Sequence, residues 1–280
     1  MNYNKDMKML ILDSIILALR EDIGSGDVTT ETVIPAEMKI SANIIAKESG
    51  IICGLLIAKL VFLSVDKTIE FTDKAKDGKY VKKGAVVATV KGSARGILTA
   101  ERTALNFLQR LSGISTLTNK FVKAAGKGVK ILDTRKTTPG LRYLEKYAVK
   151  IGGGFNHRLG LYDAVLIKSN HVHIAGGVKT AVSLARKQFS WVEVEAKTPG
   201  QVNEAIGSGA SRIMLDNMSI ADIKRSVKSV KASKRKIEIE VSGGVTLGNI
   251  RKIAGTGVDC ISIGALTHSA PALDMNLKVV

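Results

Sequence analysis

Six short apolar segments recur through the second half of the chain, and each is followed by residues with helical periodicity. They are residues 130–132, 164–167, 191–194, 212–215, 237–241 and 260–263. A spacing of about 20 to 35 residues is typical of repeated strand–helix units. Strands that are apolar on both faces predict a parallel sheet covered by helices. Polar residues follow the first five of these segments and glycine follows the sixth, and in a barrel such strand ends converge at one opening. The G-x-G-x-x-G motif, which is typical of the first turn in a doubly wound sheet, does not occur in the sequence.

We therefore predict an α/β fold, an incomplete parallel (β/α) barrel of about six or seven strands, with a smaller N-terminal α+β open-sheet domain. The N-terminal part mixes helical and strand patterns: helices are expected at 6–20 and 55–65, and strands at 40–47, 68–71 and 86–90. A long helix is expected at 101–125. The predicted domains are 1–105 and 106–269, with a tail, 270–280, that packs on the first domain.

Four sites carry the signature of a helix N-cap. Thr138-Pro139 and Thr198-Pro199 each place a hydroxyl before a proline, which is favoured at the first helical position. Ser219 and Thr246 are the other two predicted caps.

The charge of the chain favours anionic ligands. Its 42 Lys and Arg against 25 Asp and Glu give a net charge of +17. Aromatic residues make up only 4% and do not alternate with the basic runs, so we expect no specific nucleic-acid binding. The two cysteines are isolated in apolar stretches, and no apolar run is long enough to span a membrane. We expect a cytoplasmic protein with free thiols.

Cations gather at the predicted strand ends. They are Arg135, Lys136, His157, Arg158 and Lys168. The carboxylates Glu195 and Asp216 stand at the same ends but are too few to balance them. A surplus of positive charge in a cleft implies a polyanionic ligand. The two carboxylates could stabilise a developing cation, hold a divalent metal through bound phosphates, or orient the hydroxyls of a sugar.

The last two predicted strands end in glycine. Ser242, Gly243 and Gly244 follow the fifth strand and Gly264 the sixth. Exposed backbone amides at such turns bind anions, and phosphate sites at the last strands recur in barrels.

Longer motifs carry a resemblance to one family. They span residues 133–142 (DTRKTTPGLR), 152–158 (GGGFNHR), 166–171, 193–195, 214–217, 242–244 and 264–271, with 21–30 and 101–107 upstream. Together they resemble quinolinate phosphoribosyltransferase over nearly the whole chain. Ser169 departs from the pattern, since an acidic residue is expected after Lys168.

The resemblance implies transfer of phosphoribose from phosphoribosyl pyrophosphate to quinolinate, with decarboxylation, in NAD biosynthesis. The products are nicotinate mononucleotide, pyrophosphate and CO2, and the cofactor is Mg2+, held through bound substrate near Glu195 and Asp216. The residues it assigns to quinolinate are Arg102, Arg135, His157, Arg158 and Lys168. Those assigned to catalysis are Lys136, Glu195 and Asp216, and those assigned to the 5′-phosphate are Ser242, Gly243, Gly244 and Gly264. His268, which follows the last predicted strand, is a further candidate that either closes the opening or packs there.

The resemblance also implies a homodimer with shared active sites, in which Arg102 reaches into the partner's site. A higher oligomer is also compatible with it.

The residues are also compatible with three other functions. One is a paralogue of the same fold associated with molybdenum metabolism, which Ser169 keeps in view. A barrel enzyme with Lys168 as a Schiff-base nucleophile is the second. The third is a nucleic-acid-binding protein, which would show steeply salt-dependent binding.

Overall fold

The computed structural model describes residues 5–280, so residues 1–4 of the predicted N-terminal domain lie outside the described residues. The chain divides into two compact units. One contains the residues up to Asn119 together with Thr137–Gly153 and Ala265–Val280, and the other contains Lys120–Lys136 and Gly154–Gly264. The boundary predicted at residue 105 falls inside a continuous helix, α4 (Ala94–Ala125).

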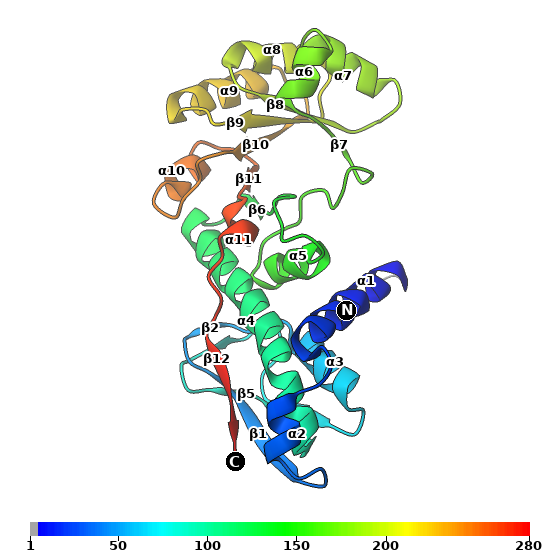
Figure 1. Ribbon diagram of the computed structural model, residues 1–280. Coiled ribbons are helices and arrows are strands. Elements are labelled where there is room, and N and C mark those ends of the chain that lie inside the picture. Colours follow the sequence, from blue (N-terminus) through cyan, green and yellow to red (C-terminus); the bar gives the residue numbers. More distant parts are fainter. Residues whose placement is uncertain (1–4) are drawn as a thin grey trace. The chain divides into compact units, whose positions relative to one another are not determined.

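The second unit is built on a parallel sheet (Figure 1). In the described part of the chain this sheet has six strands, in the order β6-β11-β10-β9-β8-β7. The strands are β6 (Lys130–Leu132), β7 (Val165–Ile167), β8 (Val192–Ala196), β9 (Arg212–Asp216), β10 (Glu238–Ser242) and β11 (Cys260–Ser262). The predicted fold class is confirmed, and each of the six strands predicted for this sheet is found within two residues of its expected bounds. Among the described residues the edge strands β6 and β7 do not pair, so the barrel is incomplete.

Apolar burial explains why these short segments form strands. Val194, Ile213, Val241 and Ile261 are each at most 2% exposed, and they lie on neighbouring strands. Burying an aliphatic side chain of this size contributes about 1.5–3 kcal/mol. Helices pack in succession on the sheet (Figure 1): α7 (Val178–Arg186), α8 (Pro199–Ser208) and α9 (Ile220–Ala232). Two shorter helices of this unit are α6 (Ser169–Ile174) and α10 (Ile250–Ala254).

The first unit combines helices with an antiparallel sheet, as the predicted α+β arrangement requires. Its described residues form an antiparallel sheet in the order β12-β1-β5-β3, and a two-stranded ribbon of β2 (Gly50–Ile51) and β4 (Tyr80–Val81). The sheet strands are β1 (Lys39–Ala46), β3 (Glu70–Asp73), β5 (Val86–Ser93) and β12 (Met275–Val279). The helices are α1 (Lys5–Ile23), α2 (Val28–Val33), α3 (Leu55–Val65), α4, α5 (Arg142–Ile151) and α11 (Ala265–His268). In the residues from 5 to 280, no helix is both long and apolar enough to cross a membrane.

The C-terminal segment crosses α4 at a glycine. A Cβ atom on Gly113 would lie 2.0 Å from the carbonyl oxygen of Pro271, so only glycine permits this approach. Beyond the crossing, the side-chain amide of Gln109 donates to the Met275 carbonyl (2.7 Å). β12 then pairs antiparallel with β1.

Two of the four predicted caps are confirmed and two are wrong. Thr198 caps α8 with Pro199 following it, and Ser219 caps α9. α5 begins only at Arg142, because Gly140 has a φ of +79° and the Leu141 N–H donates to the Thr138 carbonyl (3.1 Å), so Thr138-Pro139 forms a turn. α10 begins at Ile250, since Asn249 turns back to accept the Thr246 N–H (2.8 Å).

Candidate active site

Most of the predicted site residues lie at the carboxyl ends of the parallel strands. Asp216 and Ser242 are the last residues of β9 and β10 and are register partners. Glu195 is the penultimate residue of β8, Lys168 follows β7 directly, and Gly264 follows β11. Since the strands are parallel, these ends share one edge of the sheet, which we call the carboxyl edge.

Asp133 organises the residues that follow β6. Its side chain is fully buried, and its Oδ1 accepts the backbone N–H of His157 (2.9 Å), while Oδ2 accepts the side-chain amide of Asn156. A parallel bridge between Leu132 and Phe155 adds a second connection. These contacts hold the segment with His157 and Arg158 beside the end of β6.

Arg135 and Arg158 are brought close enough to influence each other. Burial lowers the pKa of the Arg158 guanidinium, and the charge of Arg135 lowers it further. One Arg158 nitrogen, Nη1, donates to the Ala164 carbonyl (3.0 Å), and its Nε is buried without a hydrogen-bond partner. Two neighbouring, partly desolvated guanidinium groups create a strong field for an anion.

His157 lies among buried acids. Its Nδ1 accepts the backbone N–H of Arg158 (2.8 Å), and its Nε2 lies 3.1 Å from Glu193 and 3.6 Å from Glu240. The side chain is 8% exposed. Burial opposes a charge on the ring, but the hydrogen bond to Glu193 and the charges of Glu193 and Glu240 raise the pKa of His157. These contacts give His157 a role in orienting Arg158, and its assignment as an anion ligand stays a prediction.

The sequence did not identify Arg212 and Glu240 as members of this cluster. Arg212 Nη1 lies 3.1 Å from Glu240 and 3.9 Å from Glu193, and Nη2 lies 2.6 Å from Glu238. Burial, followed by the charge of Glu193, raises the pKa of Glu240 to about 7. The signal in the sequence was the alternation of acidic and apolar residues in β10, Glu238-Ile239-Glu240-Val241, but this pattern does not reveal the partner of Glu240.

His157, Glu193 and Glu240 also have the composition of a metal site, since their ligand atoms lie within 4.8 Å of one another. The Arg212 guanidinium already supplies positive charge to both carboxylates. We therefore interpret the cluster as an ion-pair network.

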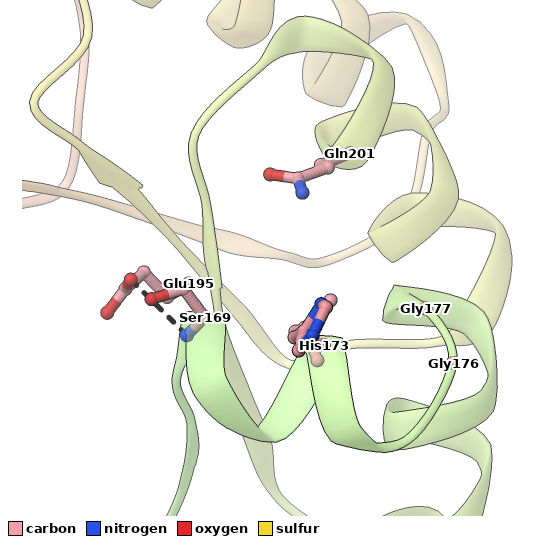
Figure 2. A pocket seen from close by; sticks show the side chains of 7 residues that line it. Ser169, His173, Gly176, Gly177, Glu195 and Gln201 are labelled. Atoms are coloured by element: carbon pink, nitrogen blue, oxygen red, sulfur yellow. Dashed lines mark hydrogen bonds between the residues drawn. The ribbon is translucent and has the colours of Figure 1, made fainter.

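Glu195 borders a cavity of about 390 Å³ at the carboxyl edge. Figure 2 shows Ser169, His173, Glu195 and Gln201 around it. The Ser169 N–H donates to Glu195 Oε1 (3.3 Å), a contact that is drawn dashed in Figure 2. Glu195 and Asp216 are partly exposed and lie on neighbouring strands, so both can accept an external ligand.

The turn after β10 requires glycine. Gly243 has a φ of +90°, and a Cβ there would lie 2.3 Å from Asn217 Oδ1. Gly244 has a φ of +62°, and a Cβ there would meet nothing within 4 Å. The Asn217 N–H donates to the Ser242 carbonyl (2.9 Å), which ties this turn to the end of β9. Gly264 lies two residues beyond the end of the neighbouring strand, β11, so the two predicted phosphate segments follow neighbouring strands.

The remaining predicted residues differ in position. Lys136 and Lys168 are exposed at the carboxyl edge, and Lys168 is the N-cap residue of α6. Arg102 and His268 belong to the first unit, where Arg102 is exposed on α4 and His268 Nδ1 lies 2.5 Å from Ser269 Oγ.

Comparison with known proteins gives the same family for both parts of the chain. Residues 27–112 match the model of the quinolinate phosphoribosyl transferase N-terminal domain, and residues 114–278 match that of the C-terminal domain.

Individual relatives are similar over almost the full length. The chain is 45% identical to the chloroplastic nicotinate-nucleotide pyrophosphorylase [carboxylating] of Arabidopsis thaliana, over 95% of this chain and 81% of that protein. It is 44% identical to a probable nicotinate-nucleotide pyrophosphorylase [carboxylating] of Bacillus subtilis, over 92% and 90%. The solved nicotinate-nucleotide pyrophosphorylase of Francisella tularensis superimposes with a TM-score of 0.91 at 44% identity, over 97% and 96%. The chain therefore belongs to the quinolinate phosphoribosyltransferase family.

Proposed function

We propose that this chain transfers the phosphoribosyl group of phosphoribosyl pyrophosphate to the ring nitrogen of quinolinate and releases CO2, giving nicotinate mononucleotide and pyrophosphate for NAD biosynthesis. Family membership supports this reaction. The observation that carries the proposal is the pair Arg135 and Arg158, two guanidinium groups held together at the carboxyl edge with a depressed pKa on Arg158. A dianionic ligand relieves their repulsion.

Quinolinate has two adjacent carboxylates, which suit this pair. An arginine fork binds two oxygens of a carboxylate at once, so Arg135 and Arg158 fix the plane of the ring as well as its charge. Lys168 adds a third cation from the end of β7. His157 contributes through the backbone of Arg158, whose N–H it accepts.

Phosphoribosyl pyrophosphate takes the other part of the carboxyl edge. In this proposal the backbone at Ser242, Gly243, Gly244 and Gly264 holds its 5′-phosphate, and Lys136 meets the pyrophosphate. A phosphate oxygen can approach the amides of Gly243 and Gly244 closely because neither residue has a Cβ.

Glu195 and Asp216 fit a magnesium ion. Carboxylate oxygens are the ligands that Mg2+ prefers, and in such sites substrate phosphates complete the shell. Both carboxylates are accessible on neighbouring strands, and Glu195 keeps one oxygen free of the Ser169 hydrogen bond. When bound, Mg2+ would neutralise the charge of the departing pyrophosphate.

The transfer itself needs positioning and charge. The quinolinate nitrogen attacks C1 of the ribose as the C1–oxygen bond breaks, and the electron pair of that bond leaves with pyrophosphate. Positive charge develops on the ribose in the transition state, and Glu195 and Asp216 stabilise it electrostatically. Arg135 and Arg158 hold the nucleophile in line, which removes much of the entropic barrier.

Decarboxylation follows from the charge on the ring. The nitrogen that carries ribose is cationic, so the ring accepts the electron pair of the bond to the adjacent carboxylate. CO2 leaves, and a proton takes its place on the ring carbon. The protein has only to hold that carboxylate in position.

The proposal includes a cytoplasmic homodimer. Cys53 and Cys260 are buried free thiols, as a reducing compartment allows. Arg102, exposed on α4, completes the quinolinate site of the partner subunit.

Titration calorimetry with quinolinate tests the proposed site. Arg158→Ala should weaken quinolinate binding roughly 10- to 100-fold, because hydrogen bonds to a charged group are lost. Arg158→Lys should retain only part of the wild-type affinity. Arg225→Ala is the matched control: this arginine pairs with Asp222 on α9 and is 71% exposed. Equal affinity of wild type and Arg158→Ala would contradict the assignment.

A further inference from the structure

A partly buried ion pair joins α4 and α5, and none of the proposed roles uses it. Arg110 Nη2 lies 2.8 Å from Glu145 Oε1, and Arg110 Nε lies 3.1 Å from the same oxygen. The Glu145 side chain is fully buried and that of Arg110 is 27% exposed. Replacing such a pair by apolar residues often costs a protein little stability. The other contacts of the pair therefore indicate what it is for.

These contacts reach two further segments of the same unit. Glu145 accepts both the hydroxyl (2.8 Å) and the backbone N–H (3.1 Å) of Thr138, one through each carboxylate oxygen. Arg110 donates to the backbone carbonyls of Thr267 and Ala270, the latter at 3.0 Å. The pair thus ties the segment after β6 to the segment after β11.

Both segments continue directly from residues of the proposed site. β6 and β11 are paired neighbours, with Leu132 opposite Ser262. Lys136 lies two residues before Thr138, and Gly264 lies three residues before Thr267. In the proposed function these two residues meet opposite ends of the same substrate, phosphoribosyl pyrophosphate.

We propose that Arg110 and Glu145 are positioning residues that fix the spacing between the Lys136 segment and the Gly264 segment for phosphoribosyl pyrophosphate. The proposal rests on the proposed function. A guanidinium is suited to this task because its planar donors can bind a carboxylate and two carbonyls simultaneously, whereas a lysine ammonium has no fixed fork.

Arg95 provides a matched control on the same helix. Its Nε donates to the Ile34 carbonyl (2.8 Å) and its Nη2 to the Glu31 carbonyl (3.0 Å). It is therefore an arginine of α4 that binds two backbone carbonyls, but the segment it holds contains no proposed site residue.

The test compares full-length wild type, Arg110→Lys, Glu145→Gln and Arg95→Lys by steady-state kinetics. For Arg110→Lys and Glu145→Gln we expect the KM for phosphoribosyl pyrophosphate to rise about tenfold or more, while the KM for quinolinate stays within about twofold. Arg95→Lys should change neither KM. An unchanged KM for phosphoribosyl pyrophosphate, or equal rises for both substrates, would overturn the proposal.

Calorimetric titration with phosphoribosyl pyrophosphate alone separates this proposal from the proposed function, because it requires no turnover. Wild type that binds this substrate but forms no product contradicts the proposed reaction, and a wild-type affinity in Arg110→Lys contradicts the positioning role. Thr138→Val removes the hydroxyl that donates to Glu145 (2.8 Å) and accepts from Arg110 (3.5 Å), and it is the milder variant if Arg110→Lys does not fold. A wild-type affinity in both folded variants, Thr138→Val and Glu145→Gln, would also overturn the proposal.

Discussion

Buried charge is the main feature at the scale of single residues. His157, which precedes Arg158 in the chain, and Arg212 each lie within ion-pair distance of Glu193 and Glu240, and both of these glutamates are fully buried. Such a network is costly to desolvate, and the attraction between its opposite charges offsets part of that cost. Because His157 accepts the Arg158 N–H, the network holds the backbone of Arg158, the proposed quinolinate ligand, in place.

The network gives stability a defined pH dependence. The folded-state pKa of Glu240, about 7, lies above the ordinary value of 4.5, so the native state binds a proton that the unfolded state has already released. Its stabilising contribution is complete below about pH 4.5 and is lost as pH rises through about 7. The raised pKa of His157 acts in the same direction.

We predict that the stability advantage of wild type over Glu240→Gln shrinks on going from pH 5 to pH 8, by an amount on the order of 1–3 kcal/mol. Urea unfolding at pH 5, 6, 7 and 8 measures the difference directly. A difference that is constant, or that grows with pH, would show that Glu240 does not hold a proton in the native state.

A second prediction at the residue scale concerns the turn after β10. Gly243→Ala should cost about 1–3 kcal/mol, because the residue has a positive φ and its Cβ would displace the Asn217 side chain. Gly244→Ala should cost only about 1 kcal/mol, since its Cβ meets open space. Thermal unfolding of the two variants checks the order, and a larger loss for Gly244→Ala would contradict it.

At the scale of elements, the strands were predictable because burial on both faces leaves continuous apolar runs. The helix N-caps were harder to predict from the sequence. Thr198-Pro199 and Thr138-Pro139 look alike in sequence, but a glycine with positive φ after Pro139 and the bond between Thr138 and Glu145 convert the second into a turn. β2, β4 and β12 were not predicted, since two of them are only two residues long and the third depends on pairing with β1.

The difference between true and false caps is measurable. Thr198→Ala should destabilise the protein by about 1 kcal/mol, because its side chain accepts the Gln201 N–H at the start of α8. Thr246→Ala should have a smaller effect, since Thr246 does not cap α10. Chemical denaturation of both variants distinguishes them, and equal losses would reject the cap assignments.

The residues at the carboxyl edge were easier to predict from the sequence than the buried charged residues beneath them. Residues at the carboxyl edge were recognisable because each follows an apolar strand, as Lys168 and Asp216 do. Arg212 and Glu240 lie inside strands, and their partners come from other strands distant in sequence. Charge pairing of that kind is a property of the assembled sheet, so periodicity alone does not reveal it.

At the scale of the whole molecule, the proposed dimer predicts complementation between inactive variants. Arg102→Ala removes a group from the partner's site, whereas Arg135→Ala removes one from its own. In an equal mixture that exchanges subunits, half the dimers are mixed and each has one complete site, so activity should return to about one quarter of wild type. A mixture that stays inactive after subunit exchange would contradict the sharing of sites.

The most direct test of the central claim is turnover of quinolinate labelled in its 2-carboxylate. Purified protein with phosphoribosyl pyrophosphate and Mg2+ should yield nicotinate mononucleotide and labelled CO2 in equal amounts. Nicotinate in place of quinolinate should give no product, and Arg135→Ala should abolish the reaction. A folded, dimeric protein that forms no product from quinolinate, or that uses nicotinate equally well, would contradict the proposed reaction.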